Sequence, residues 1–441
     1  MMGTSTAGWL PELPPDSGDF PASGGGWRGD LLATSQGTPR AVLANAITAL
    51  RFAPEWDGVL GYNDFSMCTV TLKPPPWDNG VAGAEWTDHE DRLTADWLQH
   101  HEILVSVEIA GLAVQTVARE RTFHPVRQYL ESLEWDGTRR IDDWPCRYLG
   151  VEPSLYARAV GARWLMSAVA RIYEPGCKAD CALILEGDQG LMKSTGLKVL
   201  AEPWFTDEIA DLGTKDAAMQ TRGVWIIEIA ELDSMSRAEV SKVKGFISRT
   251  SDRFRPPYGK RLIESARQCV FAGSVNHSTY LRDETGGRRF WPVTCTRILI
   301  DDLRRDRDQL WAEAVARYRA GERWWLDTAE LVLAAEQEQA DRYEGDAWDE
   351  LMAKWIEGRE SVSIDEILTM CLDKAKGTWT QSDKNRVSRS LRALGWERHK
   401  TGPRIRREWR YRPRRVSQFS DVSRSGSQCE SQDGTRETYE R

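Results

Sequence analysis

The sequence predicts an α/β protein in which a core of alternating strands and helices lies between two smaller domains. Short apolar runs alternate with helical segments over residues 126–345, the pattern of a parallel sheet covered by helices. Inside this region, a glycine-rich turn follows one apolar run and opens a helix. Further along, residues 350–412 show two helical segments followed by two short strands. These three observations define the predicted fold class.

The composition is that of a soluble globular protein. Of the 441 residues, 41% are hydrophobic and 29% are charged, and this length suits about three domains. No apolar run approaches the roughly 18 residues that cross a bilayer, and the N-terminus lacks the pattern of a secretory signal. The eight cysteines are scattered, as in proteins of a reducing compartment. We therefore expect a cytoplasmic protein with no membrane partner.

Changes in composition divide the chain into five segments. Both ends are rich in glycine, proline, serine or arginine, which is typical of flexible chain. The first structured segment has helical signals, such as the capping box formed by Thr87 and Glu90, and offers no catalytic constellation. The expected boundaries are a flexible arm at 1–38, a small mostly helical accessory domain at 39–125, the α/β core at 126–345, a winged-helix DNA-binding domain at 350–412 and a disordered tail at 413–441.

The C-terminal segment has the outline of a winged helix-turn-helix. Ser363 and Glu366 would cap one helix, and a second helix would run over 382–394. Two strands, 396–400 and 404–411, would then form a hairpin, the wing.

Basic residues of this segment suggest contact with DNA. Residues 398–415 contain nine basic side chains and one acidic side chain, a net charge of +8. Arg386 and Arg389 would lie on the outer face of the second helix, and Arg406 and Arg410 would lie in the wing. Winged helices also dock other proteins, and this alternative stays open.

The most specific motif is a predicted phosphate-binding loop between strand 182–186 and the next helix. Phosphates require inward-pointing backbone N–H groups, a helix N-terminus behind them and a nearby positive side chain. Lys193 would reach the β- and γ-phosphates and Ser194 would ligate Mg²⁺, whereas Met192 replaces the glycine usual before the lysine. An ordinary strand-to-helix turn is the alternative. The loop comprises Gly187, Asp188, Gln189, Gly190, Leu191, Met192, Lys193, Ser194 and Thr195.

Roughly thirty residues after the phosphate loop, a second apolar strand, 224–229, ends in two carboxylates. In a parallel sheet, acids at the end of such a strand lie beside the phosphate loop. Glu228 would support Mg²⁺, and Glu231 would orient the attacking water. Strands often end in exposed acids, but the order and spacing after the loop favour the catalytic interpretation.

A third strand, 268–274, precedes further candidates. Asn276 could hold the water or the γ-phosphate, or it could simply form a turn. Arg288 and Arg289 follow on a glycine-rich loop, and one of them could act as an arginine finger across a subunit boundary. A solvated surface pair is the alternative for the two arginines.

Residues 237–267 form a basic segment in an otherwise acidic chain. The segment contains nine basic and three acidic residues, a net charge of +6, whereas the whole chain has a net charge of −8. Such a segment can bind a phosphate backbone or form a solvated face. Charge alone leaves both interpretations open.

Four stretches together resemble the virulence-associated protein E family. They are residues 123–138, the phosphate loop, residues 246–259 and residues 288–292. The resemblance covers about 120–325 and implies a P-loop ATPase of phages and mobile elements, similar to superfamily 3 and poxvirus-type replicative helicases. It also implies an AAA+-like fold, ATP and Mg²⁺ as cofactors, and a hexamer-type ring on DNA. Met192 departs from the family pattern, which has glycine there.

The resemblance further implies roles for individual residues. The catalytic residues would be Lys193, Glu231, Asn276 and one of Arg288 and Arg289, and the Mg²⁺ ligands would be Ser194 and Glu228. A basic hairpin that faces the channel of the ring would bind DNA through Lys244, Arg249, Arg253, Arg255, Tyr258 and Lys260.

The predicted function is an ATP-dependent DNA helicase or translocase in phage or mobile-element replication inside a bacterial host. Its partners would be single-stranded or forked DNA and further copies of the same chain. A separate primase could act alongside, since residues 1–120 lack a polymerase-like set of carboxylates. The alternative is a nucleotide-binding and DNA-binding regulator with weak or no ATP hydrolysis, which Met192 and the charged C-terminal segment would suit.

Overall fold

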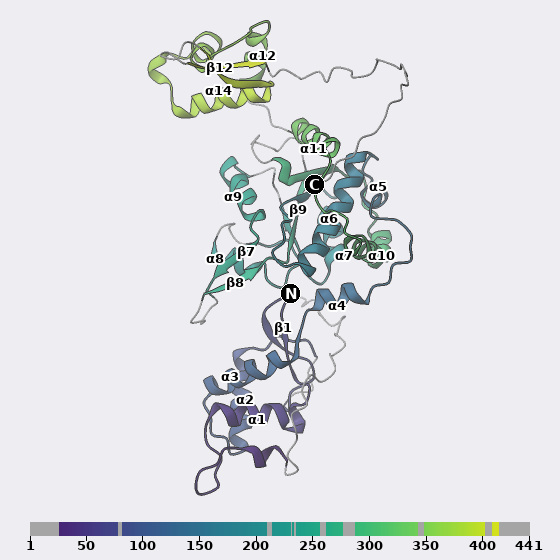
Figure 1. The fold of residues 1–441 in the computed structure, drawn as a ribbon, viewed down its shortest axis with the longest axis vertical. Coiled ribbons are helices and arrows are strands. Elements are labelled where there is room, and N and C mark those ends of the chain that lie inside the picture. The colour runs from purple at the N-terminus through teal and green to yellow at the C-terminus, as the bar shows by residue number, and fades with distance from the viewer. Residues whose placement is uncertain are drawn as a thin grey trace, which may run out of the picture. The chain divides into compact units, whose positions relative to one another are not determined.

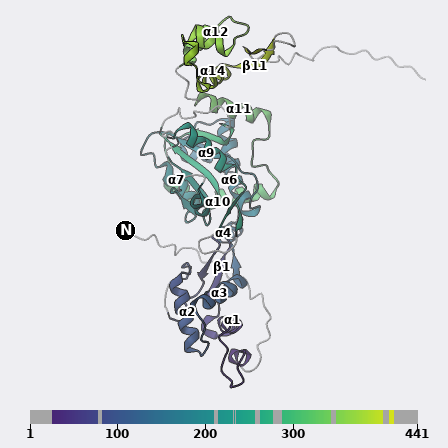
Figure 2. The ribbon, with the colours of Figure 1, turned by 90° about the vertical axis from the view of Figure 1, so that its left-hand side faces the viewer.

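A computed structural model gives the arrangement of the chain (Figures 1 and 2). It describes residues 26–77, 82–209, 214–230, 232, 235–255, 262–276, 287–342, 348–401 and 408–413. The chain divides into two compact units between Glu344 and Gly345. Among the described residues, no helix combines the length and apolar character that crossing a membrane requires.

The N-terminal part of the first unit packs three helices around a small sheet of order β2–β1–β3. Thr87 and Glu90 form the predicted capping box at the start of α2. Ala46, Trp56 and Leu98 belong to the buried core of this part. The elements are α1 Leu43–Phe52, β1 Leu60–Asn63, β2 Cys68–Thr71, α2 Asp88–His100, α3 Val107–Ala118 and β3 Thr122–Phe123, with 3₁₀ turns at Trp27–Asp30, Pro54–Trp56 and Arg119–Arg121.

The rest of the first unit is built on a five-stranded sheet of order β10–β4–β9–β6–β5. Every neighbouring pair is parallel, so all five carboxyl ends lie along one edge. This sheet confirms the predicted α/β class. Its strands are β4 Ala182–Glu186, β5 Phe205–Thr206, β6 Ile226–Ile229, β9 Val270–Val275 and β10 Phe290–Thr294. A separate antiparallel pair joins β7 Ser251–Phe254 to β8 Ile263–Ala266.

Helices cover both faces of this sheet. Leu183 and Leu185 of β4 belong to the core shared with α6, α7 and α10, whereas Ile184 belongs to the core shared with α9. The alternation is that of a strand buried on both sides. The helices are α4 Pro125–Ser132, α5 Trp144–Leu149, α6 Leu155–Tyr173, α7 Lys193–Ala201, α8 Lys215–Gln220, α9 Arg237–Ile247, α10 Ile300–Arg319 and α11 Ala329–Asp341, with a 3₁₀ turn at Gly287–Arg289.

The second unit consists of short helices and one hairpin around a small core. Capping boxes at Ser363 and Thr380 begin two of the helices, and Val387 and Leu391 are fully buried, as their helical spacing predicts. The second hairpin strand is described over 408–413, and residues 404–407 of the predicted strand 404–411 lie outside the described residues. The elements are α12 Asp349–Ile356, α13 Ile364–Glu366, a π-helical turn Ile367–Cys371, a 3₁₀ turn Lys376–Thr378, α14 Gln381–Ala393, β11 Trp396–Thr401 and β12 Glu408–Pro413.

Candidate functional site

The predicted phosphate loop lies where the carboxyl end of β4 meets the N-terminus of α7. Residues 187–192 connect the two elements, and α7 begins at Lys193. The neighbouring strands β9 and β6 end at the same edge of the sheet. Asn276, which follows β9, and Glu228, which lies in β6, therefore come close to the loop.

Three residues of the loop have positive φ. Gly187 (φ 144°) and Gly190 (φ 89°) adopt such conformations readily, and a Cβ on Gly187 would lie 2.6 Å from the carbonyl oxygen of Cys295. Met192, at the position usually held by glycine, has φ 62° and ψ 35°. This left-handed conformation costs a residue with a side chain about 1–2 kcal/mol. The Met192 side chain is 53% exposed, so methionine takes the glycine-like backbone and keeps its thioether at the surface.

Lys193 is held inside the loop by three acceptors. Its ammonium group donates to the carbonyl oxygens of Gly187 at 2.6 Å and Asp188 at 3.0 Å, and to Asn276 Oδ1 at 3.2 Å. The side chain is buried, and these bonds account for its three N–H donors. A phosphate that enters the loop must therefore replace existing acceptors of Lys193.

Ser194 and Glu228 form a second pair beside the loop. Ser194 Oγ donates to Glu228 Oε1 at 2.8 Å. The other carboxylate oxygen, Glu228 Oε2, is buried and has no hydrogen-bond partner among the described residues. A buried carboxylate oxygen without a partner is costly, and a cation would compensate it. The hydroxyl and the carboxylate are oxygen ligands of the kind that suits Mg²⁺.

The N-terminus of α7 adds backbone donors to the site. Met192 is its N-cap, and no side chain caps the helix there. The first N–H groups of an α-helix have no partner within the helix and carry partial positive charge. Together with Lys193, this helix end suits a phosphate group.

A buried ion cluster holds the strand end that precedes the loop. Arg342 Nε donates to Glu186 Oε1 at 2.5 Å, and Thr294 Oγ1 donates to Glu186 Oε2 at 2.9 Å. Arg342 also pairs with Glu338 at 2.6 Å, in the last part of α11. No local sequence pattern marks this cluster, because Arg342 and Glu186 are 156 residues apart and only the folded sheet brings them together.

Comparison with protein families identifies this part of the chain. Residues 130–344 match the virulence-associated protein E-like domain. This similarity covers a little less than half of the chain. The match confirms the resemblance drawn from the motifs and covers the phosphate loop, Glu228 and Asn276.

Two solved structures similar to the chain come from one protein, NrS-1. The apo structure of its C-terminal region (305–718) has 12% identity and a TM-score of 0.42, and the match covers 80% of this chain and 95% of that chain. The A form apo structure of the same region has 13% identity and a TM-score of 0.37, with coverages of 64% and 77%. Both TM-scores lie below the level that supports a shared fold. Among curated proteins, none matches the chain.

Within the matched region, Arg288 and Arg289 lie at the opposite edge of the sheet from the phosphate loop. They directly precede β10, which pairs in parallel with β4 from its first residue. The length of β4 separates the two edges, roughly 15 Å at about 3.3 Å per residue. Arg289 Nε donates to Ser248 Oγ at 2.6 Å, whereas Arg288 is exposed. Neither arginine joins the cluster around Lys193 of its own chain.

Only part of the predicted basic surface is exposed. The assignment of Lys244 to DNA is wrong, because its side chain is buried and its Nζ lies 5.7 Å from the centroid of the Phe290 ring. This side of α9 packs on the sheet. Arg249, Arg253 and Arg255 are exposed at the end of α9 and along β7. Arg249 also pairs with Asp252 at 3.4 Å, so the part of the basic surface that stays exposed is not all without partners.

Part of the predicted set falls outside what the structure describes. Glu231, Tyr258, Lys260 and Arg406 lie outside the described residues, and so does the side chain of Arg389. Their roles stay predictions from the sequence.

In the second unit, two predicted DNA contacts have partners inside the fold. The guanidinium group of Arg386 lies 3.8 Å from the centroid of the Trp348 ring. Arg410 is half-buried and pairs with Glu366 at 2.7 Å. Arg410 thus lies in the hairpin as predicted, and its side chain joins the hairpin to α13.

The exposed face of the hairpin carries a different set. Arg398 and Lys400 lie 4.0 Å and 4.7 Å from the centroid of the Trp409 ring, which is 46% exposed. This cluster is not among the predicted contacts. The signal that could have revealed it is the strand register, which pairs Lys400 with Trp409.

Proposed function

We propose that the protein is an ATP-dependent DNA helicase or translocase with an AAA+-like core. The observation that carries the proposal is the meeting of Lys193, Ser194 and Asn276 with the Glu228 carboxylate at one edge of a parallel sheet. Strand β9 lies between β4 and β6, so Asn276 reaches Lys193 from the adjacent strand. A lysine, a hydroxyl group, an acid and a polar side chain are the groups that phosphoryl transfer from a nucleoside triphosphate requires.

ATP would change the partners of Lys193. In the proposed complex its ammonium group keeps Asn276 and exchanges the carbonyl oxygens of Gly187 and Asp188 for oxygens of the β- and γ-phosphates. The N–H groups at the start of α7 would bind the same phosphates. The bonds from Lys193 to these two carbonyl oxygens must break before the phosphates can bind. We therefore expect ATP to bind this loop more weakly than a loop in which the bonds are absent.

The proposal assigns Mg²⁺ to Ser194 and Glu228. Their oxygens fit the ion, because Glu228 Oε2 is buried without a partner among the described residues. When bound, the ion would neutralise charge on the transferring phosphoryl group. Glu231 keeps its predicted role of orienting the attacking water.

An arginine finger is part of the proposal, and it would act between copies. Arg288 and Arg289 lie across the sheet from their own phosphate loop, so each could reach only the nucleotide of a neighbouring chain. This position supports a homo-oligomeric ring. An arginine that reaches the transferring phosphoryl group typically raises the rate of hydrolysis by a factor of about 10³–10⁵.

Single-stranded or forked DNA is the proposed substrate. Arg249, Arg253 and Arg255 give one exposed cationic surface, and the hairpin of the second unit gives another through Arg398 and Lys400. The motifs resemble those of phage and mobile-element ATPases, so we assign the activity to replication of such DNA.

The test compares Lys193→Ala with Lys198→Ala, an exposed lysine on the same helix. Calorimetry with ATP and Mg²⁺, steady-state hydrolysis and strand displacement on forked DNA are measured on full-length protein. We expect Lys193→Ala to lose all three signals and Lys198→Ala to keep them. Wild-type hydrolysis in Lys193→Ala would refute the loop assignment.

A second candidate function is a DNA-binding regulator that binds ATP without turning it over. The backbone of Met192 favours it, since strain in the loop could hinder the geometry of hydrolysis. Measurable ATP binding with no hydrolysis on single-stranded DNA would select this function over the first.

A further inference from the structure

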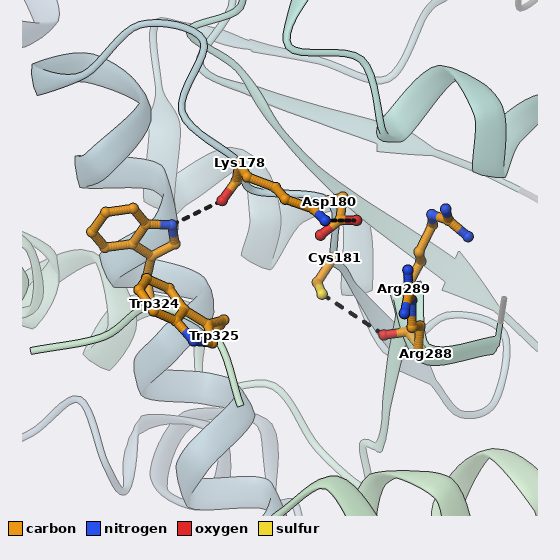
Figure 3. A pocket seen from close by; sticks show the side chains of 7 residues that line it. All are labelled: Lys178, Asp180, Cys181, Arg288, Arg289, Trp324 and Trp325. Atoms are coloured by element: carbon orange, nitrogen blue, oxygen red, sulfur yellow. Dashed lines mark hydrogen bonds and ion pairs between the residues drawn. The ribbon is translucent and has the colours of Figure 1, made fainter. Parts of the chain in front are cut away.

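A cavity of about 450 Å³ opens at the edge of the sheet opposite the phosphate loop (Figure 3). Its volume falls within the range of small-ligand sites. It lies beside the residues that precede β4 and β10, so it is separate from the site around Lys193. The lining residues are Lys178, Asp180, Cys181, Arg288, Arg289, Trp324 and Trp325.

One wall of the cavity is aromatic and fixed in position. The rings of Trp324 and Trp325 are perpendicular, with centroids 5.1 Å apart. The indole N–H of Trp324 donates to the Lys178 carbonyl oxygen at 2.9 Å, and Arg163 Nε donates to the Trp325 carbonyl oxygen at 2.8 Å. Trp325 is nonetheless 45% exposed. These bonds fix the indole of Trp324 and the backbone of Trp325, so the exposed Trp325 ring is presented from an anchored segment and offers a stacking surface.

The facing wall is cationic. Lys178, Arg288 and Arg289 line the cavity against a single acid, Asp180, which lies 3.8 Å from Lys178 Nζ. Among the described residues, none forms a hydrogen bond or ion pair with the Arg288 guanidinium group. Figure 3 shows the two tryptophans on one side of the cavity and the arginines across from them.

The remaining lining residue is a neutral group. Cys181 Sγ donates to the Arg288 carbonyl oxygen at 3.7 Å, and burial raises the pKa of this thiol well above its usual range. The thiol therefore adds no negative charge, and the cavity keeps a positive balance of two.

A ligand for this cavity needs a flat ring and a negative charge. Bases of single-stranded nucleic acid stack on aromatic side chains while their phosphates pair with arginine and lysine. We propose that the cavity binds one nucleotide unit of single-stranded DNA, with its base on Trp325 and its phosphate at Arg288. The proposal rests on the DNA-binding part of the proposed function and requires no ATP hydrolysis.

The surroundings offer a path for the strand. Arg289 bonds to Ser248, which directly precedes Arg249 and the β7–β8 pair. A strand bound along the exposed arginines of β7 can thus continue to the cavity. If Arg288 serves the strand, Arg289 is left as the finger toward a neighbouring nucleotide.

The first experiment measures the affinity of full-length protein for a fluorescein-labelled oligodeoxythymidylate by anisotropy, without ATP, in the Lys193→Ala background. We expect Trp325→Ala to weaken binding about 5- to 150-fold, the range for loss of one stacked base. Trp325→Tyr should retain most of the affinity, whereas Trp325→Leu should behave like alanine, because it keeps the apolar volume without a stacking ring. Thermal melting checks that the variants fold.

The second experiment locates the base. A strand containing 5-iododeoxyuridine is irradiated on the protein, and the adduct is mapped by mass spectrometry. The expected adduct is on Trp325 or Trp324. Thymidine monophosphate should compete only far above the concentration of the strand.

Three results would overturn the proposal. One is unchanged affinity in Trp325→Ala, and another is competition by thymidine monophosphate as strong as by the strand, which would make the cavity a free-nucleotide site. The third is loss of self-association in Trp325→Ala with DNA binding intact, which would make it a contact between copies. Failure of ATP to bind or be hydrolysed affects none of these measurements, so the two proposals fail separately.

Discussion

The Ser194 hydroxyl group donates to one oxygen of Glu228, 34 residues away, and leaves the other oxygen buried without a partner among the described residues. The bond exists because Ile226 and Glu228 occupy the face of β6 that α7 covers. Burying a carboxylate oxygen without a hydrogen-bond partner lowers the stability of the fold. A cation bound to that oxygen would restore the lost stability.

Replacing Glu228 by glutamine should therefore have opposite effects on stability and on Mg²⁺ binding. We expect the free energy of unfolding without nucleotide to rise, because a neutral amide costs less to bury than a carboxylate, even though its NH2 group takes the place of the unpaired oxygen. The Mg²⁺-dependent part of ATP affinity should fall, while affinity measured in EDTA stays unchanged. Denaturant unfolding and calorimetry check both, with the exposed Glu208→Gln as control. A Glu228→Gln protein with normal Mg²⁺ dependence would remove Glu228 from the metal site.

Replacing Met192 by glycine should relieve the left-handed backbone. The gain of about 1–2 kcal/mol is partly offset by the extra freedom of glycine in the unfolded chain, so stability should rise by up to about 1 kcal/mol. ATP hydrolysis should stay equal or increase. Met192→Ala is the control, since it removes the thioether but keeps the strain. If hydrolysis falls in Met192→Gly and not in Met192→Ala, the loop depends on a restricted backbone at this position.

Two inactive variants should complement each other if the finger acts between copies. Lys193→Ala lacks a functional phosphate loop, and Arg289→Ala lacks the finger. In mixed assemblies, an intact loop of one copy can meet an intact arginine of the other, so we expect part of the hydrolysis rate to return. Arg288→Ala mixed with Lys193→Ala is measured in parallel. Mixtures of Lys193→Ala with either arginine variant that show no more activity than their components would argue against a shared site.

Arg253 should contribute to the salt dependence of DNA binding. We expect Arg253→Ala to weaken binding to single-stranded DNA and to reduce the slope of log affinity against log salt by about 0.7, the value for one phosphate contact. Arg304→Ala, an exposed arginine on α10, serves as the control and should leave the slope unchanged. An identical slope in Arg253→Ala would exclude β7 from the DNA path.

The second unit should lose stability at low pH through Asp383. The hydrogen bond from Lys374 lowers the pKa of Asp383 to about 2. Because the pKa is lower in the folded than in the unfolded chain, the carboxylate stabilises the fold above about pH 4, and this contribution is lost as the pH falls toward 2. In Asp383→Asn, unfolding should depend less on pH in this window. Equal pH dependence in the two proteins would show that other groups dominate.

Much of the site could be predicted because its signals are local. Gly187 to Ser194 mark a loop by composition, and strand 182–186 was placed correctly because a fully buried strand is a continuous apolar run. Asn276 and Glu228 followed from the ends of the next strands in a parallel sheet.

Other features depend on contacts that composition does not encode. Lys244 has the charge of a surface residue, but the register of α9 turns it onto the Phe290 ring. Arg410 pairs across the fold with Glu366 in the same way. The cavity at Trp325 joins three segments that are more than a hundred residues apart at their extremes, so only the fold reveals it.

Arg342 forms a buried ion pair with Glu186. Arg342 lies two residues before Glu344, the last residue of the first unit. The polypeptide that leads to the second unit is thus fastened to the residue in front of the phosphate loop. A substitution that removes either partner of this ion pair would therefore disturb the last described residue of the first unit and the strand end before Gly187 together.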